Sequence, residues 1–162
     1  MTDGTGGSDE VPALLSGTAL SVFRLNGQFL AVSERLSRPA GLTAARWQVL
    51  GAVLEEPLPV AGIARAMGIT RQSVQRVADL LVDAGLAVYL PNPAHRRAKL
   101  LAPTEAGLTA VRAIVPGHRE FAGQLAEQLG GAAGLAEVRE ALRRLTEALD
   151  ALEPGAADTP GT

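Results

Sequence analysis

Apolar residues recur at helical spacing along most of the chain, and helix-breaking residues divide this pattern into segments. The first segment, at about residues 12–36, follows the helical period only loosely and ends at Pro39 and Gly41. Thr43 is a suitable N-cap for a second helix over about residues 44–54. The chain is therefore expected to begin with one long helix and one short helix.

Two further helices are expected, each with one stripe of apolar residues spaced three and four positions apart. Gly68 separates them, Thr70 is the expected N-cap of the second, and Gly85 is placed to end it. Helices patterned in this way pack their stripes together across the turn, as in a helix-turn-helix. The stripes are Val60, Ile63, Ala64 and Met67, then Val74, Val77, Ala78 and Leu81.

Two runs suited to β-strands follow, at residues 86–90 and 99–102. Between them, Pro91 and Pro93 flank Asn92 and mark a turn, and a basic stretch follows the turn. The pattern predicts a β-hairpin with a protruding basic tip, the alternative being an ordinary mobile surface loop.

The C-terminal part is expected to be helical. A helix opens at Thr104 and reaches about Leu129, and we expect Pro116 to kink or interrupt it. A glycine-rich turn leads to a last helix with a narrow apolar seam, which suits lengthwise packing on another helix. That helix belongs either to a second copy of the chain, which we favour, or to the same chain. The seam residues are Leu135, Val138, Leu142, Leu145, Leu149 and Leu152.

These elements predict a mostly α fold with a small β-hairpin wing. The architecture is a winged helix-turn-helix whose N- and C-terminal helices form a dimerisation region. The expected organisation is a flexible tail at 1–10, one domain at 11–153 and a second tail at 154–162, with the winged helix-turn-helix at about 42–103 and dimerisation helices at about 11–37 and 104–153.

Charge is unevenly distributed along a chain whose net charge is −2. Residues 65–99 carry six basic and two acidic side chains, whereas both flanking regions carry more acids than bases. A local basic block in an acidic chain is typical of a nucleic-acid reader, although a solvated surface is the alternative. The absence of cysteine excludes disulfides and thiol chemistry. With no signal peptide or membrane-spanning run, we expect a cytoplasmic protein.

The start of the fourth expected helix carries the side chains best suited to reading DNA. A recognition helix places its N-terminal residues in the major groove, where Arg can bond guanine and Gln can bond adenine. Asp79 and Asp83 come late in the helix, where it leaves the groove. The alternative is an ordinary solvated face. The candidate DNA-binding residues are Thr70, Arg71, Gln72, Ser73, Gln75 and Arg76 in the helix, and Arg96, Arg97 and Lys99 in the hairpin.

Four segments, at residues 42–50, 63–77, 80–86 and 96–107, resemble the MarR family of transcription regulators. The resemblance extends from about Val11 to Leu152. It implies a two-fold homodimer, a fourth helix that reads a pseudo-palindromic operator, and a hairpin that acts as a wing. It also implies repression of neighbouring genes, relieved in many members by a small aromatic or phenolic ligand.

The resemblance also suggests where such an effector binds. The chain departs from the family pattern at one position of the wing. The effector would lie between the dimerisation and DNA-binding regions, although the protein is also compatible with having none. His95 occupies the place of the wing Asp that usually braces the matching Arg, here Arg97, so we expect a looser wing. The candidate effector-binding residues are Phe23, Phe29, Trp47 and His118, and each is also compatible with simple packing.

Two other classes of function were weighed. An enzyme is disfavoured because His95 and His118 lie in separate segments and no nucleophile, phosphate-binding or dinucleotide motif is present. We therefore expect no catalytic site, no metal site and no cofactor. A winged-helix module that binds proteins instead of DNA is the second alternative, and the Gln- and Arg-rich helix face disfavours it.

Overall fold

A computed structural model describes residues 9–152 of the chain. These residues fall into two units, one ending at Val115 and one beginning at Pro116. Predicted tails 1–10 and 154–162 lie outside the described residues except for Asp9 and Glu10. In chain order the elements are α1 (Glu10–Ser37), the short 3-10 helix η1 (Arg38–Ala40), α2 (Ala44–Ala52), β1 (Leu58–Pro59), α3 (Val60–Met67), α4 (Arg71–Asp83), β2 (Ala87–Leu90), β3 (Leu100–Pro103), α5 (Glu105–Gln128) and α6 (Ala132–Leu152).

The predicted helix caps are confirmed in the first unit. The Thr43 hydroxyl accepts a hydrogen bond from the backbone N–H of Arg46, and the Thr70 hydroxyl accepts one from Ser73 at 3.2 Å. Gly68 has a φ of +63° between α3 and α4, a backbone conformation that few residues other than glycine adopt readily. The caps and the glycine turn together set where α4 begins.

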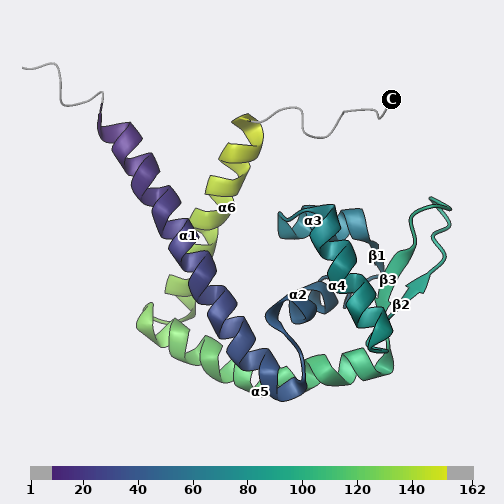
Figure 1. Ribbon diagram of the computed structural model, residues 1–162. Coiled ribbons are helices and arrows are strands. Elements are labelled where there is room, and N and C mark those ends of the chain that lie inside the picture. Colours follow the sequence, from purple (N-terminus) through teal and green to yellow (C-terminus); the bar gives the residue numbers. More distant parts are fainter. Residues whose placement is uncertain (1–8, 153–162) are drawn as a thin grey trace, which may run out of the picture. The chain divides into compact units, whose positions relative to one another are not determined.

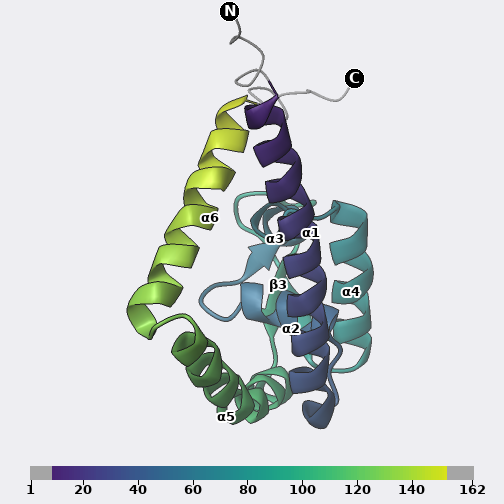
Figure 2. The same ribbon diagram turned by 90° about the vertical axis from the view of Figure 1, so that its left-hand side faces the viewer.

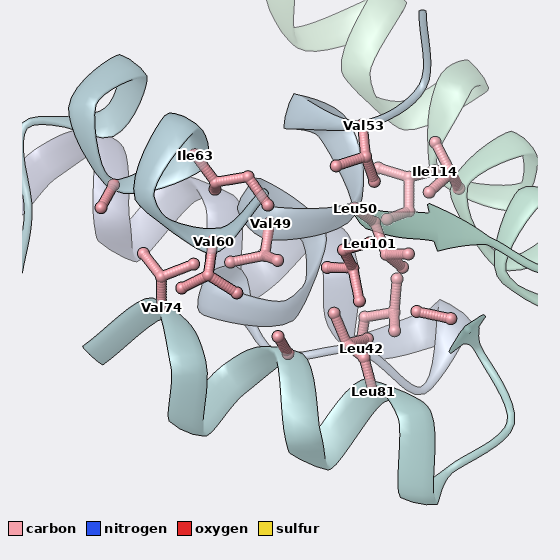
Figure 3. Packing of buried hydrophobic residues seen from close by; sticks show 14 residues of the cluster. Leu42, Val49, Leu50, Val53, Val60, Ile63, Val74, Leu81, Leu101 and Ile114 are labelled. Carbon is pink, nitrogen blue, oxygen red and sulfur yellow. The ribbon is translucent and has the colours of Figure 1, made fainter. Parts of the chain in front are cut away.

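The apolar stripes of α3 and α4 meet in the core of the first unit, as the spacing predicted. Ile63 of α3 and Val74, Ala78 and Leu81 of α4 are fully buried, together with Leu50 of α2. Figure 3 shows these helices presenting their apolar side chains to one another. This packing leaves the polar side of α4 facing outward.

The hairpin is part of a three-stranded antiparallel sheet with strand order β1-β3-β2. β2 and β3 pair from Ala87 opposite Pro103 to Leu90 opposite Leu100. β1 was not predicted, because a two-residue strand containing Pro59 has no alternating pattern to detect. It pairs with β3 and extends the sheet at the start of α3.

The base of the hairpin is fixed to the start of α5. The Thr104 backbone N–H donates to the Leu86 carbonyl, and the Thr104 hydroxyl donates to the Gly85 carbonyl at 2.7 Å. The same hydroxyl accepts from the N–H of Gly107, so Thr104 also caps α5. Gly107 is buried against the main chain of Leu86. The wing therefore joins the helical core through a tightly packed corner.

The second unit contains the later part of α5 and the whole of α6, which are joined by a short turn (Figure 2). α5 runs without a break from Glu105 to Gln128, so the predicted interruption at Pro116 is not found. A proline removes one helical hydrogen bond, and the turns on either side of it keep theirs. None of the residues of α6 is buried, and the seam residue Leu149 is 52% exposed.

Candidate nucleic-acid interface

The first turns of α4 bring most of the predicted DNA-binding side chains to one exposed surface. Val74, Ala78 and Leu81 anchor the opposite side of the helix in the core. Thr70 and Ser73 bond each other through their hydroxyl oxygens, 2.8 Å apart, at the helix start. The exposed candidate residues of this surface are Thr70, Arg71, Gln72, Ser73 and Arg76.

Two open hollows border this surface of α4. One, of about 670 Å³, lies between the start of α2 and α4 and includes Thr43, Arg46 and Ser73 in its lining. The other, of about 740 Å³, lies along the side of α4 that carries Gln75 and Asp79. Gln72, Arg76 and Leu80 line both hollows. The helix therefore stands out as a ridge, the shape required to enter a DNA groove.

The hairpin carries the remaining predicted cations at its tip, which extends beside α4 in Figure 1. Arg96, Arg97 and Lys99 are all exposed, and they lie in the segment between the paired residues of β2 and β3. The Asn92 side chain accepts the N–H of Ala94, which shapes the turn. His95 is also exposed at the tip, where its carbonyl accepts the N–H of Ala98.

The cations of this surface are available to an external anion. Within residues 9–152, ion pairs join Arg112 to Glu105 within α5 and Arg143 to Glu140 and Glu147 within α6. No hydrogen bond or ion pair within the same residues engages the side chains of Arg71, Arg76, Arg96, Arg97 or Lys99. Phosphate neutralisation by such cations supplies much of the affinity of proteins for DNA.

A polar cluster that the sequence did not indicate joins α4 to β2. Tyr89 donates a hydrogen bond from its hydroxyl to Asp79 Oδ1, and the Gln75 side-chain amide nitrogen bonds both partners. Burial, together with the hydrogen bond from Tyr89 to Asp79, raises the pKa of Tyr89 to about 12. The strand pattern held a signal for it, because Tyr89 shares a sheet face with buried Ala87, and an inward tyrosine needs a partner for its hydroxyl.

The four candidate effector-binding residues lie in different surroundings. Phe23 and Phe29 are on α1 and are 71% and 48% exposed. Trp47 of α2 is half-buried and packs against the hydrophobic core, and His118 is exposed in the second unit. Effector binding by these residues therefore stays a prediction.

Residues 9–152 contain neither a cluster of potential metal ligands nor a candidate membrane-spanning helix. No group of three or more histidine and acidic side chains is arranged there to hold a metal ion. In the same part of the chain, no helix combines the length and apolar character needed to cross a membrane.

Comparisons with known proteins agree with this geometry. A sequence profile described as MarR family matches residues 40–98. An uncharacterized protein of Mycobacterium tuberculosis is 40% identical over 147 residues, which cover 91% of this chain and 99% of that protein. The transcriptional regulator MosR of the same species, solved in complex with DNA, is 22% identical, with a TM-score of 0.70 over 83% of this chain and 97% of that one. CouR from Rhodococcus jostii RHA1, bound to p-coumaroyl-CoA, is 24% identical, with a TM-score of 0.66 over 96% of this chain and the whole of that one.

The helix-turn-helix formed by α3 and α4, followed by the β2–β3 wing, defines a winged-helix DNA-binding transcription regulator. The chain belongs to the MarR family. The predicted fold class is confirmed: the chain is mostly helical, with long N- and C-terminal helices and a small antiparallel sheet. The family is one of transcription regulators and not of enzymes.

Proposed function

We propose that this protein acts as a homodimer that binds a pseudo-palindromic operator and represses neighbouring genes. The observation that carries the proposal is the exposed ridge of α4, with Arg71, Gln72 and Arg76 unpaired above a buried apolar stripe. Arg and Gln at the start of a helix are the side chains that distinguish base pairs in the major groove. Arg96, Arg97 and Lys99 of the wing then contact phosphates or the adjacent minor groove.

The dimer part of the proposal rests on apolar side chains that are exposed to solvent in a single chain. On α1, Leu14, Leu20 and Phe23 are each more than 60% exposed. On α6, the seam residues Val138, Leu142 and Leu149 are exposed as well. Several large apolar side chains exposed along one helix are typical of a protein interface. We assign both helices to the contact between two copies.

The repressor part of the proposal includes relief by a ligand. CouR, of similar fold, is bound to p-coumaroyl-CoA, which contains a phenolic group. We propose an aromatic or phenolic effector for this protein too, with Phe23, Phe29, Trp47 and His118 as candidate contacts. A thermal-shift screen of aromatic acids and their thioesters would test it. A hit must also weaken operator binding to count in favour.

The deciding experiment is the selection of bound sequences from a random duplex library at about 150 mM salt, which suppresses non-specific phosphate binding. We expect an inverted repeat with half-site centres about 10 base pairs apart, the spacing that a two-fold dimer requires. An active dimer that enriches no motif would overturn the proposal and favour a protein-binding winged helix. A reporter gene placed behind the recovered operator then distinguishes repression from activation.

A further inference from the structure

Gln75 differs from the other candidate base-reading residues because its side chain is already bonded within the protein. It is half-buried, whereas Arg71, Gln72 and Arg76 are exposed. The Gln75 Nε2 atom lies 2.9 Å from Asp79 Oδ1, one turn along α4, and 2.8 Å from the hydroxyl oxygen of Tyr89 on β2. The Tyr89 hydroxyl oxygen lies 2.7 Å from the same Asp79 oxygen. The three polar groups form a closed triangle.

The chemistry of the partners determines which end of the Gln75 amide faces them. The Asp79 carboxylate can only accept hydrogen bonds, so Tyr89 donates its single proton to it and is left as an acceptor. Both neighbours of the Gln75 amide are therefore acceptors, and the amide must turn its nitrogen towards them. A reversed amide would place its oxygen against the carboxylate, and no proton would lie between them.

The Tyr89 hydroxyl keeps this arrangement across the neutral range. Its pKa is raised to about 12, chiefly by burial and then by the bond to Asp79, so the phenol stays protonated at neutral pH. Because the two acceptors are only 2.7 Å apart, they lie on the same side of the Gln75 nitrogen. The triangle therefore anchors the nitrogen end of the side chain.

The oxygen end of the Gln75 amide is left without a partner. Among residues 9–152, no group donates a hydrogen bond to Gln75 Oε1. Gln75 also borders the larger hollow beside α4, together with Arg71 and Gln72. In the major groove, adenine and cytosine present an amino donor, whereas guanine and thymine present a carbonyl acceptor at the corresponding place. A Gln75 amide held with its oxygen free can accept a hydrogen bond from adenine or cytosine. The same oxygen is repelled by the carbonyl oxygen of guanine or thymine.

We propose that Tyr89 and Asp79 are positioning residues that hold Gln75 as a hydrogen-bond acceptor, so that it selects an amino-bearing base, adenine or cytosine, at one position of each half-site. This inference rests on the proposed operator binding and deepens it, because it assigns a chemical preference to one side chain of α4. It also gives strand β2 a part in sequence choice without any contact to DNA.

The test compares base-preference profiles from parallel library selections. The wild type should prefer adenine or cytosine roughly tenfold at one half-site position. Gln75→Ala should abolish the preference at that position alone. Tyr89→Phe keeps the ring and removes the hydroxyl, so the amide can reverse and the preference should fall to roughly two- to threefold, within the range of a weakened contact. If Tyr89 only stabilised the wing, Tyr89→Phe would weaken binding to all sequences. The base preference at this one position would then stay unchanged.

A second pair of variants controls for charge. Asp79→Asn introduces a hydrogen-bond donor into the triangle. It should weaken the base preference at the same half-site position as Tyr89→Phe does. Asp83→Asn makes the same change of charge one turn further along α4, where no hydrogen bond to Gln75 is made, and should leave the profile unchanged. Both variants should bind all sequences somewhat more tightly, because each removes a negative charge near the phosphates.

Each outcome bears on a distinct claim. If the wild type enriches a palindrome and Gln75→Ala leaves every position unchanged, the inference is overturned and the operator proposal stands. If Gln75→Ala flattens a position that Tyr89→Phe and Asp79→Asn leave intact, Gln75 reads DNA without help from the triangle, and the inference is likewise wrong. If the wild type enriches no motif, both the proposed function and the inference fail.

Discussion

Gly107 lies where the first turn of α5 passes the main chain of Leu86, and only the absence of a side chain permits the approach. A Cβ atom at this position would lie 2.0 Å from the Leu86 carbonyl oxygen. That oxygen already accepts the N–H of Thr104, so it has no room to move away. The corner that joins the wing to the core therefore depends on glycine.

Gly107→Ala should lower the free energy of unfolding by about 1–3 kcal/mol or more, the usual cost of overpacking. Urea denaturation followed by circular dichroism measures the change. Gly123→Ala is the matched control in the same helix, because nothing lies within 4 Å of its added Cβ. The control should leave stability unchanged or raise it by about 0.5–1 kcal/mol, since alanine favours helix over glycine. Equal effects of the two substitutions would contradict the close approach.

Tyr89 is the only tyrosine of the chain, so its titration is readable by phenolate absorbance. We expect a midpoint near pH 12 in the folded protein, above the ordinary tyrosine pKa of 10.0. Because the folded-state pKa is raised, the stabilisation from the neutral phenol is complete below pH 10 and is lost as the pH rises towards 12. Asp79→Asn should bring the midpoint closer to 10, since it removes a carboxylate that raises the pKa. An unshifted wild-type midpoint would argue against the triangle.

Gln75 marks the limit of prediction from sequence at the residue scale. Its place on the outward side of α4 follows from the apolar stripe, as does that of Gln72. Its bonding to Tyr89 depends on how closely β2 approaches α4, which is a tertiary distance and leaves no periodic pattern in the sequence. The helix caps Thr43 and Thr70 were predictable because capping is local chemistry.

At the scale of elements, we expect α4 and the wing to have different roles in DNA binding, and substitutions should separate these roles. Arg76→Ala should cost about 1–3 kcal/mol of operator affinity and relax the preference at one base position, because Arg reads guanine through two bonds. Arg97→Ala should instead weaken binding to all sequences or change the preference for A/T pairs beside the half-site. Binding titrations against the selected operator and its single-base variants provide the measurement.

Arg139→Ala is the control for this pair, because it removes an exposed arginine of α6 that lies outside the candidate interface. It should leave operator affinity within the error of the titration. Matching base-preference profiles for Arg76→Ala and Arg97→Ala would show that the roles of helix and wing are wrongly assigned.

Some helices and strands were predicted correctly from the sequence and others were not, for physical reasons. The bounds of α3 were predicted correctly, because Val60 and Gly68 supply a sharp apolar start and a glycine stop. α2 was predicted to reach Leu54 and ends at Ala52, since helix ends fray over one or two residues. β1 was missed because two residues carry no period. Pro116 was expected to kink or interrupt α5, and the helix is not interrupted, because neighbouring turns of a long helix compensate for one lost bond.

At the scale of the whole molecule, the apolar seam of α6 should decide whether two copies associate. Leu142→Glu places a charge in the seam, and burying an unpaired charge at an interface costs more than the contact returns. We expect the variant to sediment as a monomer at concentrations where the wild type is a dimer, and to lose binding to the full palindrome. Analytical ultracentrifugation gives the measurement.

Ala136→Glu is the control for the seam, because it adds the same charge to α6 at an exposed position outside the seam. It should leave the oligomeric state unchanged. A dimeric Leu142→Glu protein would indicate that the seam packs within one chain, which was the alternative left open by the sequence.

The ladder between β2 and β3 stops at Leu90 and Leu100, and the residues between them contribute no strand pairing. At the other end of the hairpin, the hydrogen bonds from Thr104 to Gly85 and Leu86 hold its base in place. We therefore expect insertions, deletions or exchanges at the tip to leave α4 and the β2–β3 pairing unchanged. If α4 and the wing bind DNA as proposed, two copies of this gene that arise by duplication can keep one half-site sequence and diverge in the flanking bases that each wing favours. The hairpin tip can therefore evolve independently of the rest of the winged helix-turn-helix.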